Sequence, residues 1–199
     1  MRIPQLFLLA AFTLGLGMAS LAAQKAPITV DNVKFNSGVS PYDWNNIVIK
    51  LRANSNPDPE AANPRYVDNI TVRLSVAYED GANKGKYVAF ESEVTIATIE
   101  VGKDKTFAFW IPYDIVERGN FGKEPFGWVI ELQVDGKKLP MNRDNTSSNI
   151  TNDAALQSFY TNAVSPTANE NEGIMMPYYL SPYGPVDREP PAFIRKEPK

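Results

Sequence analysis

The chain contains neither cysteine nor histidine. It therefore cannot form a disulfide, build a Ser-His-Asp or Cys-His nucleophile, or bind zinc through the ligands that structural zinc sites prefer. It also lacks a basic run, and 20 Lys and Arg against 23 Asp and Glu give a net charge of −3. A nucleic-acid partner is disfavoured, because no stripe of positive charge would neutralise phosphates. The catalysis that remains open would need a carboxylate pair or a Ser–Lys arrangement.

The first 23 residues have the pattern of a secretory signal peptide. Arg2 precedes an apolar run over residues 6–21, and small residues at the exit fit cleavage after Ala22 or Ala23. The run is short for a membrane-spanning helix of about 20 apolar residues. We therefore expect an exported protein of the periplasm, outer surface or extracellular space, with no transmembrane segment after signal cleavage. An exported chain without disulfides is typical of the bacterial envelope.

Residues 24–141 alternate between apolar and polar side chains, which is the pattern of half-buried β-strands. The clearest run is NITVRLSVAY, residues 69–78, and turn signals separate such runs roughly every 8–12 residues. No long helical periodicity intervenes. The pattern predicts an all-β, immunoglobulin-like two-sheet sandwich. The side chains expected in its core are Ile47, Ile49, Leu51, Ala53, Ile70, Val72, Leu74, Val76, Tyr78, Phe107, Phe109, Ile111, Trp128, Ile130, Leu132 and Val134.

The dipeptide Asp-Gly at 135–136 predicts a tight hairpin turn, because both central positions of such a turn need positive φ. This turn would place Leu132 opposite Leu139 and Ile130 opposite Met141. All four apolar side chains then lie on one face, so the turn and the hydrophobic pattern predict the same register.

Other connections are expected from their turn residues. Residues 79–85 and the segment GKDK, residues 102–105, resemble hairpin turns. Residues 112–120 are expected to form one helical turn that ends at Gly119. The strand over residues 94–101 changes phase, which indicates a bulge or a strand break.

Three segments resemble bacterial immunoglobulin-like or fibronectin-III-like modules: YVDNITVRLSVAYED, IEVGKDKTFAFWIP and GWVIELQVDGKKLP. The pattern is most similar to secreted immunoglobulin-like proteins of pilus-associated gene clusters in Akkermansia-type bacteria. The resemblance covers roughly residues 28–141 and implies a sandwich fold in an extracellular setting. It transfers no catalytic residue, and the Cys-Trp-Cys set of antibody domains is missing.

Carboxylates are the remaining candidates for catalysis, namely Asp43, Asp68, Glu91, Glu93 and Glu131. Glu91 and Glu93 share the polar face of one expected strand, and Glu131 points away from the core. We interpret them as a solvated sheet face, and we expect neither enzymatic activity nor a cofactor.

Two segments are rich in oxygen ligands and raise the question of calcium. Residues 54–60 place Asn, Asp and Glu at alternate positions, but two prolines interrupt them and the glycine of an EF-hand loop is missing. Residues 142–153 contain only two acids. Turn chemistry explains both segments better, and a weak calcium site stays an open alternative.

Two tryptophans bear on the question of a ligand. Trp128 is in phase with Ile130 and is expected in the core. Trp110 is out of phase with Phe109 and Ile111, so it is either exposed or covered by the C-terminal segment. Because an exposed aromatic ring on a sandwich can stack on a sugar, a carbohydrate-binding module is the alternative function.

Residues 142–199 do not repeat the sandwich pattern. Residues 152–164 have helical spacing and predict one amphipathic helix that ends before a proline. Residues 165–173 are expected to be a polar linker. The apolar face of the helix would consist of Leu156, Phe159, Tyr160 and Ala163.

Residues 173–186 are apolar and aromatic and contain three prolines. They carry too much apolar surface for a tail left in water, and the prolines remove donors that a continuous ladder with a neighbour would need. A strap over the protein's own sandwich is favoured over partner docking and over disorder. The residues expected to contact the sandwich or a partner are Trp110, Met175, Met176, Tyr178, Tyr179, Leu180 and Tyr183.

These patterns together predict a secreted, non-enzymatic structural or adhesive protein of a bacterial envelope or pilus-associated assembly. Its partner is expected to be a protein of that assembly, with a glycan as the alternative.

Overall fold

The structure is a computed structural model that describes residues 25–195, so the expected signal peptide at residues 1–23 lies outside the described residues. The strands are β1 (Ile28–Val39), β2 (Trp44–Ala53), β3 (Tyr66–Glu79), β4 (Tyr87–Glu100), β5 (Asp104–Ile111), β6 (Gly127–Val134), β7 (Lys137–Lys138), β8 (Met176–Pro177) and β9 (Phe193–Ile194). The helices and single turns are α1 (Tyr113–Gly119), η1 (Arg143–Asn145), α2 (Asp153–Phe159), η2 (Tyr160–Val164), η3 (Asn169–Asn171) and η4 (Tyr178–Leu180).

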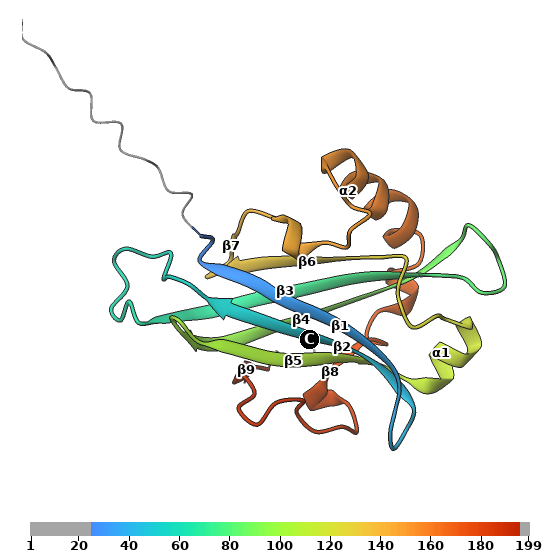
Figure 1. Cartoon of the computed structure of the whole chain (residues 1–199), viewed down its shortest axis with the longest axis horizontal. Helices are drawn as coiled ribbons and strands as arrows, with labels where there is room; N and C mark the ends of the chain where they lie inside the picture. The colour runs from blue at the N-terminus through green and yellow to red at the C-terminus, as the bar shows by residue number, and fades with distance from the viewer. Residues whose placement is uncertain (1–24, 196–199) are drawn as a thin grey trace, which may run out of the picture.

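The strands form two antiparallel sheets that pack face to face (Figure 1), which confirms the two-sheet sandwich. One sheet has the order β1-β2-β5-β8 and the other has the order β7-β6-β3-β4-β9. The prediction of a hairpin at residues 102–105 is wrong, because β4 and β5 lie in different sheets. The segment GKDK carries the chain from one sheet to the other, and Gly102 turns it with a φ of 85°.

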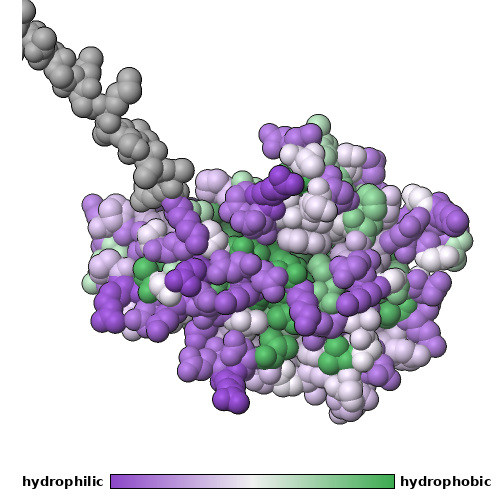
Figure 2. All heavy atoms as spheres, in the orientation of Figure 1, coloured by the Kyte–Doolittle hydropathy of each residue, from purple (hydrophilic) through white to green (hydrophobic). Residues whose placement is uncertain are grey.

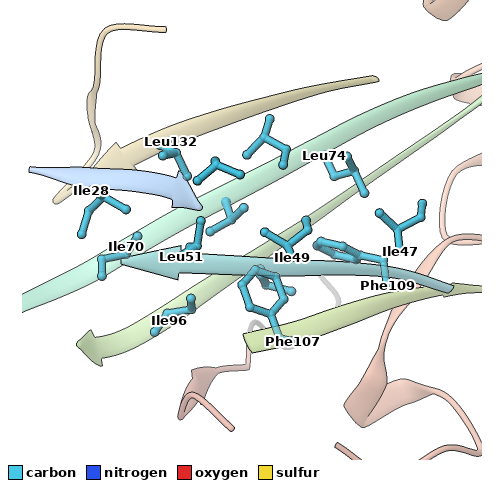
Figure 3. Close-up of a cluster of buried hydrophobic side chains, with 14 of the residues drawn as sticks. Ile28, Ile47, Ile49, Leu51, Ile70, Leu74, Ile96, Phe107, Phe109 and Leu132 are labelled. Carbon is cyan, nitrogen blue, oxygen red and sulfur yellow. The ribbon is translucent and has the colours of Figure 1, made fainter. Parts of the chain in front are cut away.

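The core lies between the sheets and is formed by alternate residues of their strands, as the period-two pattern predicts. In Figure 3 isoleucine, leucine and phenylalanine side chains from both sheets point toward one another. Trp128 is the exception among the expected core residues: it is half-buried and packs at the rim of the core, where its ring centroid lies 6.3 Å from that of Phe35.

The turn at residues 135–136 has the conformation expected for it, since φ is 48° at Asp135 and 75° at Gly136. The N–H of Leu139 donates to the carbonyl of Leu132 at 2.9 Å, and Gln133 lies opposite Lys138. The predicted register is therefore confirmed close to the turn.

Farther from the turn the predicted pairing of Ile130 with Met141 is wrong. Strand β7 ends at Lys138, and Met141 is exposed. Pro140 cannot donate to a ladder, and the carbonyl of Ile130 instead accepts from Nδ2 of Asn145 at 3.0 Å.

Helix α1 is capped by Asn120, not by Gly119 as predicted. Asn120 has the left-handed conformation, with a φ of 47°. Gly119 has a different role, because a Cβ there would lie 2.2 Å from the ring of Phe121. The Phe121 ring stacks on Tyr78 at 5.1 Å and meets Phe90 at 5.8 Å, so the glycine leaves room for an aromatic cluster at this end of the core.

The predicted amphipathic helix is present as α2, continued by the π-helical turns of η2. Asn152 caps it by accepting from the N–H of Ala155 at 2.9 Å. Its apolar side buries Phe159 and Ala163 against the outer face of the five-stranded sheet, where Ala77 of β3 is also buried. Figure 1 shows α2 outside β6. This sheet is therefore covered on both faces along part of its length.

Residues 165–173 are not the polar linker that was predicted. The N–H of Ala89 on β4 donates to Oγ1 of Thr167 at 2.9 Å, and Nδ2 of Asn171 donates to the carbonyl of Ala89 at 3.0 Å. Asn171 is buried. Side chains of this segment thus satisfy backbone groups of β4 in place of a neighbouring strand.

The bulge or break predicted from the phase change within residues 94–101 is absent, because the pairing of β4 with β3 keeps one register across that point.

Candidate interaction site

Residues 172–195, called the strap from here on, cover one edge of each sheet. Strand β8 adds to the edge of β5, and strand β9 adds to the edge of β4 (Figure 1). Because β4 and β5 are consecutive in the chain, both edges lie on the same side of the sandwich. The paired residues are Pro177 with Phe109, Met176 with Trp110, Phe193 with Ile96 and Ile194 with Thr95.

Between its two strands the strap fills the gap between the sheets. Met175 is 1% exposed and belongs to the central core. The ring of Phe193 lies 5.7 Å from Phe107 of β5, 5.6 Å from Tyr178 and 5.2 Å from Tyr179, measured between centroids. The open side of the sandwich is therefore closed by aromatic side chains and one methionine.

Tyr183 anchors the strap on the outer face of the four-stranded sheet. Its ring stacks on that of Trp110 at 3.8 Å and 7°, and Trp110 is 2% exposed. Its hydroxyl accepts from the N–H groups of Tyr42 at 3.2 Å and Trp44 at 3.3 Å, and donates to the carbonyl of Val39. Of the two alternatives left by the sequence, Trp110 is covered by the C-terminal segment.

The covering of Trp110 leaves one polar group unsatisfied. Its Nε1 is buried and has no hydrogen-bond partner within residues 25–195. A buried donor without a partner opposes the packing that buries it. The docked strap is thus stabilised by apolar contact and by Tyr183, and opposed at this one atom.

The outer side of the strap presents apolar side chains to solvent. Leu180 is 64% exposed and Ile194 is 42% exposed. Both line a hollow of about 220 Å³ between the strap and β4, which Met176 also lines. Figure 2 shows apolar areas at the lower edge of this face, where Figure 1 places β8 and β9. The expected contact residues therefore divide into an inward set, which packs on the sandwich, and an outward residue, Leu180.

The outer face of the five-stranded sheet carries a polar hollow of about 390 Å³ beside η2. Within it Arg73 lies 2.8 Å from Glu91, and Lys138 lies 3.8 Å from Glu131. Burial, and after it the charge of Glu131, raises the pKa of Tyr160 to about 12. Glu91 and Glu131 are two of the catalytic candidates from the sequence, and each forms an ion pair with a cation on a neighbouring strand.

Glu93 lines an adjoining hollow together with Arg73 and Glu91, whereas the other two candidates lie apart from these residues. Asp43 lies in the turn between β1 and β2, with a φ of 59°, and Asp68 is exposed on β3. In the loop after β2, Oδ1 of Asn56 accepts from the N–H of Asp58 at 2.8 Å, and Oδ1 of Asp58 accepts from the N–H of Glu60 at 2.9 Å. These oxygens shape the turns of the loop.

Residues 25–195 contain no group of three or more acidic, His or Cys side chains placed to hold a metal ion. Over the same range, no helix is both long and apolar enough to cross a membrane.

The fold and the strap define an antiparallel two-sheet sandwich whose C-terminal segment closes one side. A crystal structure of a protein from Akkermansia muciniphila has a similar fold, with a TM-score of 0.61 at 14% identity over 87% of this chain and 95% of that chain. Residues 1–141 alone make up less than 87% of the 199 residues. The part of the chain that is similar to this structure therefore includes residues of the C-terminal segment. No family model matches the chain, and no curated protein does.

Two substitutions of Tyr183 are expected to distinguish the contribution of its hydroxyl to stability from that of its ring. Tyr183→Phe removes the hydrogen bonds to the turn between β1 and β2 and should lower the free energy of unfolding by about 0.5–1.5 kcal/mol. Tyr183→Ala also removes the stacking on Trp110 and the apolar burial, so its effect should be larger by at least about 1 kcal/mol. Urea unfolding measures both changes, and equal effects of the two variants would contradict the role of the ring.

Proposed function

We propose that the protein is a secreted, non-enzymatic, immunoglobulin-like protein with a structural or adhesive role in a bacterial envelope or pilus-associated assembly. The observation that supports this most is the outer side of the strap. Leu180 and Ile194 remain in solvent beside a hollow, whereas most of the large apolar side chains of the strap are turned inward. Grouped apolar side chains at the surface favour a protein partner at this position.

The strand order supports the immunoglobulin-like assignment. Strands β1, β2 and β5 share one sheet, and β4 lies beside β3 in the sheet that also contains β6 and β7. In variable-type immunoglobulin domains the third strand, C, likewise shares a sheet with the last two strands, F and G, and the strand that follows C in the chain, C′, is added to that same sheet. The first seven strands follow this order, and the strap adds β8 and β9 to it.

The pilus-associated setting rests on two likenesses of different kinds. Three sequence segments resemble immunoglobulin-like proteins of pilus-associated clusters, and the similar crystal structure comes from Akkermansia muciniphila. The absence of enzymatic activity is supported by the ion pairs that hold Glu91 and Glu131. Metal-independent hydrolysis of a glycan or peptide that a single Asp or Glu substitution abolishes would overturn this part of the proposal.

A carbohydrate-binding module is the second candidate. Trp110 lies beneath Tyr183 and is not available to stack on a sugar. The observation that favours this candidate is different: Tyr42 is 51% exposed and Tyr113 is 41% exposed, and the pKa of Tyr113 is raised by Glu117 and more weakly by Asp43, the neighbour of Tyr42. Exposed aromatic rings near carboxylates are suited to sugars.

Purification from the native envelope tests the proposal. The chain with Leu180→Glu and Ile194→Glu should keep its melting temperature, because both side chains are exposed, and should lose the protein that co-purifies with the unchanged chain. Met141→Glu is the matched control, since Met141 is exposed outside the strap, and it should retain the partner. Loss of the partner in the control as well, or its retention in both variants, would overturn the strap as the contact surface. Retention on glycans without any protein partner would support the second candidate.

A further inference from the structure

We propose that the strap of one copy docks on the sandwich of a second copy and replaces that copy's own strap. The edges of β4 and β5 are then an interface between identical chains. This inference rests on the assembly role proposed above and names a second copy of this chain as one partner in it.

The strap and its docking surface are separate sets of residues. Strand β8 pairs with β5, β9 pairs with β4, and Tyr183 contacts Trp110 and the turn between β1 and β2. Contacts within the strap, such as that of Tyr178 with Phe193, move with it. Every contact between strap and sandwich can therefore form between two copies with the same chemistry as within one.

The first residues of the strap, 172–174, connect its docked part to the part of the chain that stays in place. Asn171 is fixed to the carbonyl of Ala89 on β4, whereas Met175 is already in the core. Between them Gly173 has a φ of 76°, and glycine has more accessible backbone conformations than any other residue. Three residues span at most about 10 Å, which requires the second sandwich to lie close. Exchange is therefore reciprocal and gives a closed dimer.

The attachment of the strap is suited to exchange, because each of its two ladders contains only two residue pairs. The buried Nε1 of Trp110, which lacks a partner within residues 25–195, also opposes the docked state. A released strap would nevertheless leave the apolar sites of Met175 and Tyr183 in water together with two open strand edges, which pair readily with other strands. An open copy is thus closed again by a strap, either its own or that of another open copy.

The absence of cysteine makes the exchange measurable, because every disulfide must come from introduced residues. Thr95 and Ile194 are directly opposite in the pairing of β4 with β9. One chain with Thr95→Cys and a second, larger tagged chain with Ile194→Cys are mixed at high concentration, incubated and oxidised. A docked strap of the second chain on the first holds the two thiols together, so we expect at least about tenfold more mixed disulfide than random collision gives.

The control mixture replaces Thr95→Cys by Asn83→Cys, an exposed position at the tip of the turn between β3 and β4. A second pair of positions tests the contact of the strap with β5, where Asp187 lies within hydrogen-bond distance of Thr106. The variants Thr106→Cys and Asp187→Cys replace the first pair if that pair perturbs folding. The double variant with both Thr95→Cys and Ile194→Cys, oxidised while dilute, should remain monomeric and take no part in exchange. Mixed disulfide no more abundant than in the control, for both pairs, would overturn the exchange. If co-purification of an envelope protein persists in that case, the assembly role stands without it.

Discussion

Removal of the strap by ending the chain after Asn171 is expected to lower the melting temperature by at least several degrees and to cause aggregation. The truncation exposes the core sites of Met175 and Phe193 and the face of Trp110. Burial of one large apolar side chain contributes about 1.5–3 kcal/mol, and the total stability of a domain is about 5–15 kcal/mol. For a domain of this size a loss of 1 kcal/mol shifts the melting temperature by about 2–4 °C. Thermal unfolding followed by circular dichroism and light scattering measures both effects.

The control for this truncation is a chain that ends after Arg195, which retains the whole strap. Its melting temperature should equal that of the full chain. Aggregation of the shorter chain should start from the edges of β4 and β5, since unpaired edge strands pair with other chains. Unchanged melting of the chain that ends after Asn171, together with free proteolysis of the intact protein between residues 169 and 186, would contradict the stabilising role of the strap.

Met175→Ala is expected to have the largest effect of any single substitution in the strap. Met175 is 1% exposed and joins the strap to the core between the sheets. Truncation of a buried methionine to alanine lowers the free energy of unfolding by about 2–5 kcal/mol, because it removes apolar contact and leaves a cavity. Urea unfolding of the full chain measures this loss.

Two further variants show whether the effect comes from the core position of Met175. Met176→Ala changes the neighbouring residue, which is half-buried on β8, and should have a clearly smaller effect. Met175→Leu keeps most of the volume and should lower the free energy of unfolding by less than about 1.5 kcal/mol. Equal losses for the two alanine variants would contradict the placement of Met175 in the core.

The sandwich could be predicted from the sequence because alternation is a local signal. In β2 the residues from Ile47 to Ala53 alternate as the pleat of a strand requires, and those on one face are fully buried. Asp135 and Gly136 likewise determine their turn through their own torsions. Features of this kind need only neighbouring residues, and the sequence displays them directly.

Features that depend on distant segments were missed or left open. Nothing local distinguishes GKDK from a hairpin turn, because the change of sheet depends on which edges β4 and β5 pair with. Ser75 and Ala77 alternate with the core residues of β3 and so belong to its outer face, yet both are buried where η2 packs on the sheet. The cover of Trp110 by Tyr183, 73 residues later in the chain, had no periodic signal. The only hint was an aromatic residue on the wrong face of one strand and unexplained aromatics near the C-terminus.

The position of the strap in the chain also determines when folding can be completed. Within residues 25–195, β8 and β9 follow the other strands in sequence, so they leave the ribosome after those strands. Until residues 175–177 are available, both sheets lack an edge strand and the gap that Met175 fills is open, and the edge of β4 stays unpaired until residue 194 follows. The chain therefore reaches its full stability only after synthesis has passed the strap, and it is less stable before that point.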